Sequence, residues 1–242
     1  MVASTKSLAR EPLYVQVCVL ITRQIAGGIW KPNAALPNEI ELARELGVSS
    51  GTIRKALEKL EADRLVVRRQ GRGTFVVDQA GPEMVSRFDR MRRGDGAPIV
   101  WKAELLHRDS GASTPQEQKT LQVAPDEMVA RKRRLLSASG RPFAVEDATL
   151  AIGHLPGLDS TSVEDDWCLT RLAQQHAVHI SRATEAVRLA PAIPEIAVLL
   201  SVAPGTMLVR LERIISSGDE QPLEWRSATC HLQDEYYEAE VN

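Results

Sequence analysis

Residues 38–77 read NEIELARELGVSSGTIRKALEKLEADRLVVRRQGRGTFVV, a stretch with two helix signals followed by a hairpin signal. Asn38 precedes an apolar-periodic run and has Glu41 three positions later, which is the pattern of a helix N-cap. Gly47 supplies the turn, because a residue without a Cβ adopts a left-handed conformation at low cost. Ser49 is the expected N-cap of a second amphipathic helix. Its apolar positions are Ile53, Ala56, Leu57 and Leu60. The spacing predicts a helix-turn-helix.

A basic hairpin follows the second helix. Residues 65–69 are expected to form a strand, Gln70, Gly71 and Arg72 a turn with residue 73, and residues 74–77 the return strand. Taken alone, this pattern is typical of a surface hairpin with solvated arginines. Directly after a helix-turn-helix it predicts a wing, whose tip lies close to phosphates or enters a minor groove.

The second helix carries polar side chains on the faces away from its apolar positions. Arg54 is the strongest candidate for DNA contact, because its guanidinium can pair bidentately with guanine or bind a phosphate. Thr52 can contact DNA or merely complete the helix N-terminus, and Lys55 is expected to be solvated or to face a phosphate. The predicted DNA-binding residues are Ser49, Ser50, Gly51, Thr52, Arg54, Lys55, Gln70, Gly71 and Arg72.

Charge is distributed unevenly along the 242 residues. Residues 1–80 contain 12 Lys and Arg against 8 Asp and Glu, whereas the remainder contains 18 against 24. A basic N-terminal part beside an acidic body suits a protein that meets phosphates with one end only. The hydrophobic share of 43% and the charged share of 26% are typical of a globular protein with ample core.

Cellular location is predicted from three observations. No 18-residue apolar stretch indicates a membrane span, and Met1 to Lys6 lacks the apolar core of a signal peptide. Cys18, Cys168 and Cys230 are widely spaced, odd in number and without metal-ligand spacing, so we expect buried free thiols. These features predict a cytoplasmic protein without membrane contact.

The N-terminal part resembles the GntR family of bacterial transcriptional regulators. The resemblance covers about 65 residues in order and spacing, which is more specific than a lone helix-turn-helix match. It rests on Pro12-Leu13-Tyr14, Ile25, Gly28, Pro32, Leu36-Pro37, Glu39, Glu41-Leu42-Ala43, Gly47-Val48-Ser49, Thr52-Ile53-Arg54, Ala56-Leu57, Leu60 and Gly71-Arg72-Gly73-Thr74-Phe75. It implies a sequence-specific regulator, expected to be a repressor, that binds a palindromic double-stranded DNA operator as a homodimer.

Two positions depart from the family pattern. The family often has arginine between the two glutamates and directly after the N-cap serine, where this chain has Ile40 and Ser50. Each good bidentate pair contributes roughly 1–3 kcal/mol of discrimination between bases. Because Arg54 and the hairpin remain, the departures predict a different operator sequence and not a loss of binding.

The pattern after the hairpin predicts an α+β domain. We expect a winged helix-turn-helix domain over 1–78, a linker with at most one helical turn over 79–98, and a sensor domain over 99–242. Helices are expected over 11–28, 114–122, 163–175 and 193–200. Strands are expected over 99–107, 128–137, 142–150, 178–189, 207–216 and 223–231.

The sensor part resembles the UTRA effector-binding domain of the HutC-type branch, which is similar in architecture to chorismate lyase. The resemblance implies that Arg134 and Glu146 line a pocket, with Arg182 and Glu224 as weaker candidates. Arginine can hold a phosphate or carboxylate, and glutamate accepts hydrogen bonds from hydroxyls or an amine. A cross-strand pair on a solvated face explains Arg134 and Glu146 equally well. Leu136 stands where a second arginine is expected, so the effector remains open among sugars, amino sugars, sugar phosphates and carboxylates.

Two further classes of function stay open on the sequence. One is a small-molecule enzyme of chorismate lyase-like fold, and the other is a DNA-binding module without an effector. The chain has no Gly-x-Ser-x-Gly elbow, Walker loop or dinucleotide fingerprint, and its five histidines lack metal-ligand spacing. We therefore predict no catalytic residues, no metal and no cofactor.

Overall fold

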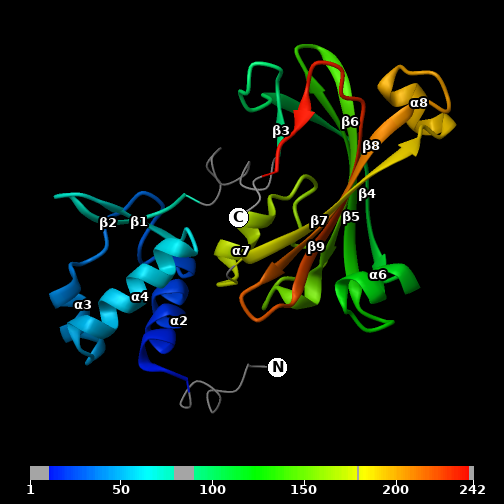
Figure 1. Cartoon of the computed structure of the whole chain (residues 1–242). Coiled ribbons are helices and arrows are strands. Elements are labelled where there is room, and N and C mark those ends of the chain that lie inside the picture. Colours follow the sequence, from blue (N-terminus) through cyan, green and yellow to red (C-terminus); the bar gives the residue numbers. More distant parts are fainter. Residues whose placement is uncertain (1–10, 79–89, 179, 240–242) are drawn as a thin grey trace. The chain divides into compact units, whose positions relative to one another are not determined.

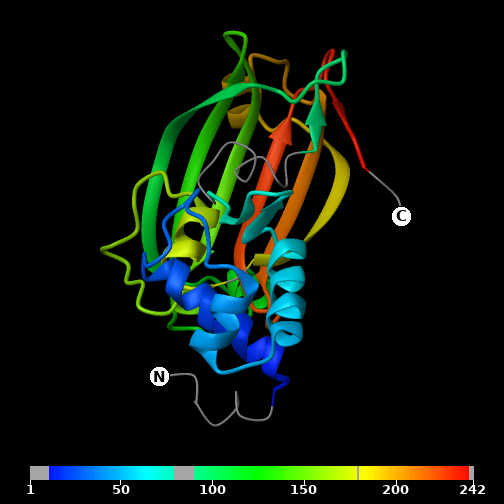
Figure 2. The ribbon, with the colours of Figure 1, turned by 90° about the vertical axis from the view of Figure 1, so that its left-hand side faces the viewer.

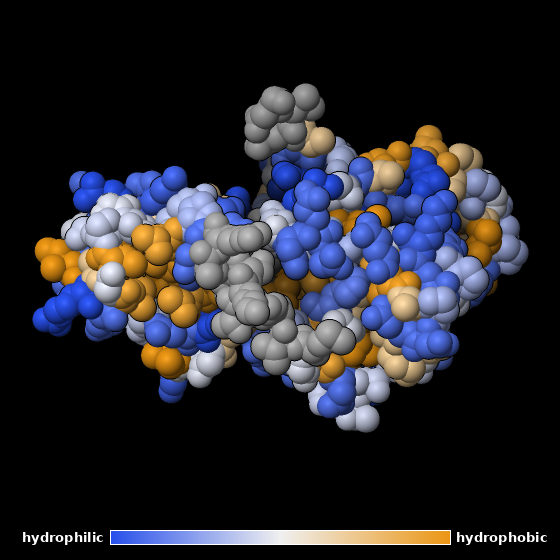
Figure 3. Space-filling model, turned by 90° about the horizontal axis from the view of Figure 1, so that it is seen from below, coloured by the Kyte–Doolittle hydropathy of each residue, from blue (hydrophilic) through white to orange (hydrophobic). Residues whose placement is uncertain are grey.

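The chain divides into two compact units in a computed structural model that describes residues 11–78, 90–178 and 180–239 (Figure 1). In the first unit lie residues 11–78 together with the segment Cys168–Ile180, apart from residue 179. The second unit contains residues 90–167 and 181–239. No helix within these ranges is both long enough and apolar enough to cross a membrane. Hydrophobic and hydrophilic residues alternate in patches over the face shown in Figure 3.

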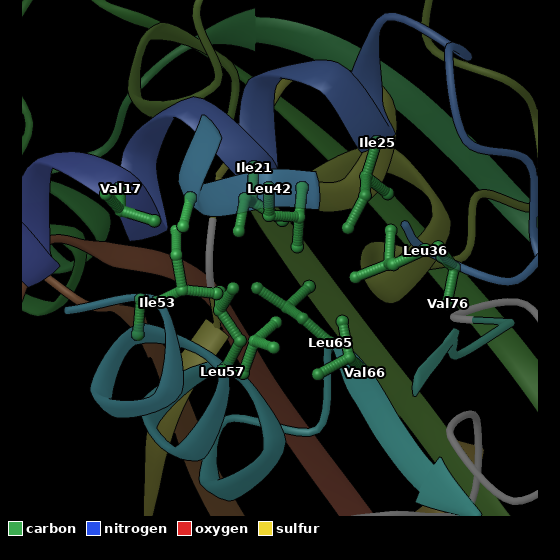
Figure 4. Close-up of a cluster of buried hydrophobic side chains, with 13 residues drawn as sticks. Val17, Ile21, Ile25, Leu36, Leu42, Ile53, Leu57, Leu65, Val66 and Val76 are labelled. Atoms are coloured by element: carbon green, nitrogen blue, oxygen red, sulfur yellow. The ribbon is translucent and has the colours of Figure 1, made fainter. Parts of the chain in front are cut away.

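Three helices and a hairpin build the first unit. Helix α2 spans Leu13–Ala26 and buries Val17, Ile21 and Ile25, which recur every four residues and form one face. Helix α4, Ser50–Ala62, buries the four apolar residues expected from the sequence. The labelled side chains of both helices, of Leu42 and of the hairpin point toward one another in Figure 4. This cluster is the core that fixes the two motif helices together.

Helix α3, Glu39–Leu46, has the predicted capping box. Asn38 Oδ1 accepts hydrogen bonds from the backbone N–H groups of Ile40 and Glu41 at 3.0 Å, and Glu41 Oε2 accepts one from Asn38 N. Gly47 ends the helix with φ 65°, in the left-handed region. The helix-turn-helix predicted from these signals is confirmed.

The hairpin pairs β1, Val66–Arg69, with β2, Gly73–Val76. Val66 and Val76 lie opposite each other and are both buried in the core of the unit. A further backbone bridge joins Ala35 to Phe75. The hairpin is therefore held on one side by side-chain burial and on the other by a segment that precedes α3.

Helix α7 is shorter than predicted. A helix was expected over 163–175, but α7 spans Leu169–Gln175. Trp167 is 1% exposed and donates a hydrogen bond from Nε1 to Glu224, so it lies in a fixed position ahead of the helix. Burying that indole with its N–H bonded stabilises a non-helical backbone more than another turn of helix would. In the first unit α7 lies against α2.

A six-stranded sheet forms the second unit, with strand order β4-β5-β6-β9-β8-β7, and Figure 2 shows its strands side by side. The strands span Trp101–Ala112 (β4), Met128–Ala138 (β5), Arg141–Ala151 (β6), Ile180–Pro191 (β7), Met207–Ser217 (β8) and Pro222–Cys230 (β9). Strands β4 to β6 pair antiparallel in sequence order, and β9 lies between β6 and β8. The predicted α+β class and the predicted strands are confirmed.

Two short helices cover one face of this sheet. Helix α6, Pro115–Leu121, packs Leu121 against Trp225, and α8, Pro194–Leu200, packs against Val145. Val145 and Trp225 share a face because Trp225 pairs with Thr149, four residues after Val145 on the same strand. Neither α6 nor α8 covers the opposite face of the sheet.

A small second sheet was not predicted from the sequence. Strand β3, Met91–Arg92, pairs antiparallel with β10, Tyr236–Tyr237. The described end of the predicted linker thus contains a strand; residues 79–89 lie outside the described residues, so the predicted helical turn stays a prediction. Met91 is buried with Phe143 and Cys230. A two-residue strand has no periodicity to detect, so only its distant partner defines it.

Candidate nucleic-acid interface and effector site

The first turn of α4 is exposed and polar. Ser49 Oγ accepts a hydrogen bond from Thr52 N at 3.2 Å and lies 2.9 Å from the Thr52 hydroxyl. The predicted N-cap is therefore present, and it engages both hydroxyls. Ser50 and Gly51 are exposed beside them. This end of the helix presents backbone N–H groups and hydroxyls, the donors that contact phosphate oxygens.

Arg54 lies on the exposed side of α4. Its side chain is 63% exposed, and its Nε donates to Glu39 Oε2 at 3.3 Å. Lys55 is also exposed, with its Nζ 4.2 Å from the centroid of the Tyr14 ring. The guanidinium of Arg54 is therefore oriented by an acid on α3, whereas Lys55 rests on α2.

Arg68 on β1 joins the same group of charges and was missed by the sequence analysis. Its Nη2 donates to the backbone carbonyl of Arg54 at 3.3 Å and lies 3.6 Å from Glu39 Oε1. Its Nε lies 3.7 Å from Glu61 Oε2, and Glu61 also accepts from the backbone N–H of Arg68. Arg68 links the hairpin to both motif helices. Its place in a basic strand beside α4 was the available signal.

The hairpin tip presents the three residues predicted for the wing. Gln70, Gly71 and Arg72 are exposed, and Gly71 has φ 67°. The turn is closed by a hydrogen bond from Arg72 N to the carbonyl of Arg69 at 2.9 Å. A left-handed glycine here lets the chain reverse within four residues while the arginine side chain stays in solvent.

Three of the four predicted effector residues, Arg134, Glu146 and Glu224, lie on the face of the sheet opposite α6 and α8. Arg134 and Glu146 are directly opposite each other on β5 and β6, and each is 8% exposed. Glu146 Oε1 accepts from Arg134 Nε at 3.1 Å and from Nη2 at 2.5 Å. The cross-strand pair that the sequence allowed is present, but it is buried and not solvated.

Glu224 on β9 belongs to the same face. It is completely buried, and its two carboxylate oxygens accept from Trp167 Nε1 at 2.8 Å and from Arg226 Nε at 2.6 Å. Arg226 also lies 3.6 Å from Glu146 Oε2. Arg226 thus connects Glu224 to the pair formed by Glu146 and Arg134.

Lys132 and Asp166 complete this group, which we call the charged cluster: Lys132, Arg134, Glu146, Asp166, Glu224 and Arg226. Lys132 Nζ donates to Asp166 Oδ1 at 2.8 Å and to the carbonyl of Trp167 at 2.5 Å. It also lies 4.5 Å from the centroid of the Trp167 ring. Arg134 Nη1 donates to the same Asp166 oxygen at 3.0 Å.

Electrostatics in the charged cluster follow from burial and pairing. Burial opposes ionisation of Glu146, yet the charges of Arg226 and Arg134 lower its pKa to about 2. Burial, with the nearby charge of Arg134, lowers the pKa of Lys132 below its ordinary value. Burial likewise opposes ionisation of Asp166, but hydrogen bonding and charge from Lys132 lower its pKa.

Sequence reasoning found part of this cluster. Lys132 and Arg226 were missed, although Lys132 lies two residues before Arg134 and Arg226 two residues after Glu224, so that alternation along a strand was the available signal. Asp166 was assigned to a helix and therefore missed. Arg182 lies apart from the cluster: its side chain is 62% exposed, and its Nη1 is 3.9 Å from Glu220 Oε1.

A separate cavity of about 840 Å³ lies on the face that α6 and α8 cover. Arg133 lines it and is paired there with Asp147 and Glu195. None of the four predicted effector residues lines this cavity. Within the described part of the chain, no group of three or more His, Cys, Asp and Glu side chains is placed to hold a metal ion.

Two family profiles match the chain. Residues 13–76 match the bacterial regulatory proteins of the gntR family, and residues 98–236 match the UTRA domain, which spans more than half of the chain.

Sequence relatives include proteins named as transcriptional regulators and repressors. The chain is 28% identical over 218 residues to the HTH-type transcriptional regulator YurK of Bacillus subtilis, with 88% of each chain covered. It is 50% identical over 70 residues to the histidine utilization repressor of Pseudomonas putida, which covers 29% of this chain and 28% of the relative. It is 31% identical over 157 residues to the mannosyl-D-glycerate transport/metabolism system repressor MngR of Escherichia coli, covering 62% and 63%.

Solved structures share the fold. The regulator YydK of Bacillus subtilis aligns with a TM-score of 0.54 at 18% identity, covering 96% of this chain and all of that one. PhnF of Mycobacterium smegmatis aligns with a TM-score of 0.54 at 20% identity, covering 93% and 99%. At these identities the likeness supports the fold alone. The two profiles and the sequence relatives show that the chain belongs to the gntR family of bacterial regulatory proteins, in the HutC-type branch that carries a UTRA domain.

Proposed function

We propose that this regulator represses transcription by placing α4 in the major groove of an operator, with the hairpin tip against the adjacent phosphates. The observation that carries the proposal is the position of Arg54. Its guanidinium is exposed, is paired with Glu39, and lies on the same helix as the N-cap formed by Ser49 and Thr52. Arg68 orients the hairpin relative to that helix. Base edges are read by Arg54, and the remaining predicted residues position the protein on the backbone.

We propose that the working form is a cytoplasmic homodimer. A single recognition helix buries little DNA surface, whereas two copies bind a palindrome with half-sites about one helical turn apart. The UTRA domain supplies the contact between the copies. The predicted boundaries, 1–78 for DNA binding, 79–98 for the linker and 99–242 for sensing and dimerisation, are part of this proposal.

We propose that a small-molecule effector binds at the charged cluster and that the chain has no enzymatic activity. Arg134 and Glu146, with Glu224 beneath them, offer both a cation and acceptors in a water-poor setting. An effector that binds one arrangement of the dimer more tightly than the other shifts the population between operator-bound and free forms.

The proposal is tested by gel shift of a DNA fragment from the region upstream of the gene. Wild-type protein is expected to shift this fragment in preference to a random duplex, with affinity falling steeply as salt rises. Arg54→Ala is expected to abolish the preference. Arg23→Ala, an exposed arginine on α2 outside the proposed surface, is the matched control and should bind normally. Normal sequence preference in Arg54→Ala would contradict the assignment.

A further inference from the structure

Asp166 has the most exposed side chain of the charged cluster. Its side chain is 47% exposed, whereas the side chains of the two cations that it touches, Lys132 and Arg134, are 0% and 9% exposed. A single oxygen of Asp166 accepts from both of them, at 2.8 and 3.0 Å. Lys132 and Arg134 thus form a buried anion site, which we call the seat. The carboxylate of the partly exposed Asp166 occupies it.

Charge balance in the cluster depends on that carboxylate. Arg134 is paired with Glu146 as well as with Asp166, whereas Asp166 is the acid that Lys132 touches among the described residues. If the Asp166 carboxylate leaves, the fully buried Lys132 loses its acidic partner. An uncompensated buried charge is costly, so the seat requires one negative charge from another source.

The geometry points to Asp166 as an internal stand-in for the effector: we propose that a monoanionic carboxylate displaces it and binds between Lys132 and Arg134. This inference rests on the proposed function and narrows it to one ligand class. A phosphate would bring more charge than the seat requires. Leu136, on the same strand face two residues after Arg134, is 3% exposed and offers no further donor.

Displacement of Asp166 also moves a segment with a second role. Trp167, the next residue, holds Lys132 through its carbonyl and ring, and Glu224 through its indole N–H. The following residue, Cys168, begins the segment that belongs to the first compact unit, where α7 lies against α2. The peptide bond between Trp167 and Cys168 is thus a direct covalent link from the seat to the unit that contains the helix-turn-helix.

The experiment uses the full chain and acetate as the probe. In Asp166→Asn the seat keeps its shape but lacks its charge. Thermal unfolding is measured in sodium acetate and in sodium chloride at equal ionic strength and neutral pH. We expect acetate to raise the Tm of Asp166→Asn by about 2–4 °C more than that of wild type. Asp165→Asn, an exposed neighbour paired with Arg108, is the matched control and should respond like wild type.

A double variant separates charge balance from general salt effects. Lys132→Met combined with Asp166→Asn removes both members of one ion pair, so no buried lysine is left without its acid and the Tm should respond to acetate like that of wild type. An acetate response of Asp166→Asn equal to that of wild type overturns the proposal. So does a response retained in the double variant, or an Asp166→Asn protein that is unfolded in both salts.

Operator binding tests the link to the first unit. Acetate should weaken the operator affinity of Asp166→Asn severalfold relative to chloride, while wild type is unaffected. If the acetate effect on Tm is present but operator affinity does not change, the anion seat stands and the transmission through Trp167 is wrong. If wild type binds no operator at all, the proposed function fails, yet the thermal result still decides the anion seat.

Discussion

Glu39 holds Arg54: the first residue of α3 accepts a hydrogen bond at 3.3 Å from the arginine that the second motif helix presents to solvent. The same carboxylate lies 3.6 Å from Arg68. One acid therefore orients two arginines from different elements. Glu39 also neutralises part of the charge of both arginines. It therefore weakens their general attraction to phosphates while it fixes their geometry.

Replacing Glu39 is expected to reduce specificity more than affinity. Glu39→Gln releases Arg54 and adds a net positive charge, so binding to random DNA should rise while discrimination falls by about fivefold or more, within the range of one bidentate pair. Competition gel shifts with operator and random duplexes measure the ratio. Glu45→Gln, an exposed acid on α3, gives the effect of the charge change alone. An unchanged ratio in Glu39→Gln would show that Glu39 does not position Arg54.

The hairpin arginine is expected to act through phosphates. Arg72→Ala should weaken binding to operator and random duplexes by similar factors and lower the slope of log affinity against log salt by about 1. Titrations over a range of salt concentrations measure the slope. A loss confined to the operator would mean that Arg72 reads bases.

Breaking the central pair of the charged cluster should cost far more than breaking an exposed one. Glu146→Gln removes the buried carboxylate that Arg134 and Arg226 share and leaves Arg134 with only the half-exposed Asp166, so we expect a loss of about 3–5 kcal/mol in the free energy of unfolding. Glu195→Gln removes a 61% exposed partner of Arg133 and should cost less than about 1 kcal/mol. Urea denaturation of both variants provides the comparison, and similar losses would refute the distinction.

Acid should destabilise the protein through Glu117. Hydrogen bonds from Arg131 to both carboxylate oxygens, at 2.6 and 2.7 Å, lower the pKa of Glu117 from 4.5 to about 2. A lowered folded-state pKa contributes stability that is complete above about pH 4.5 and is lost as the pH falls toward about 2. Wild type should lose stability across this window, and Glu146 adds to the loss because its pKa is lowered similarly.

Glu117→Gln should show a shallower fall over the same window, since it has no carboxylate to protonate there. Glu104→Gln, an exposed side chain on β4, should keep the wild-type dependence. Denaturation in urea at a series of pH values records both curves. Parallel curves for wild type and Glu117→Gln would exclude this source of acid sensitivity.

Local signals in the sequence determined the helix-turn-helix, the hairpin and the long strands. Asn38 and Glu41 satisfy each other within one turn, Gly47 reverses the chain, and the apolar spacing of α4 defines its buried face. Each of these depends on residues a few positions apart, so the sequence states them directly. The pair Arg134 and Glu146 was also accessible, because a tight turn sets the register of β5 and β6.

Only the tertiary structure decided how distant segments meet. Trp167 is among the apolar positions of the helix predicted over 163–175, yet its indole N–H donates to Glu224, 57 residues away, and the helix begins after it. Burial of Trp167 places the neighbouring Asp166 next to Lys132 and Arg134. Arg182, in contrast, lies in solvent beside Glu220. Strand β3 exists only because Tyr236 and Tyr237 pair with it. Burial and hydrogen bonding of polar groups are satisfied by partners that sequence spacing does not encode.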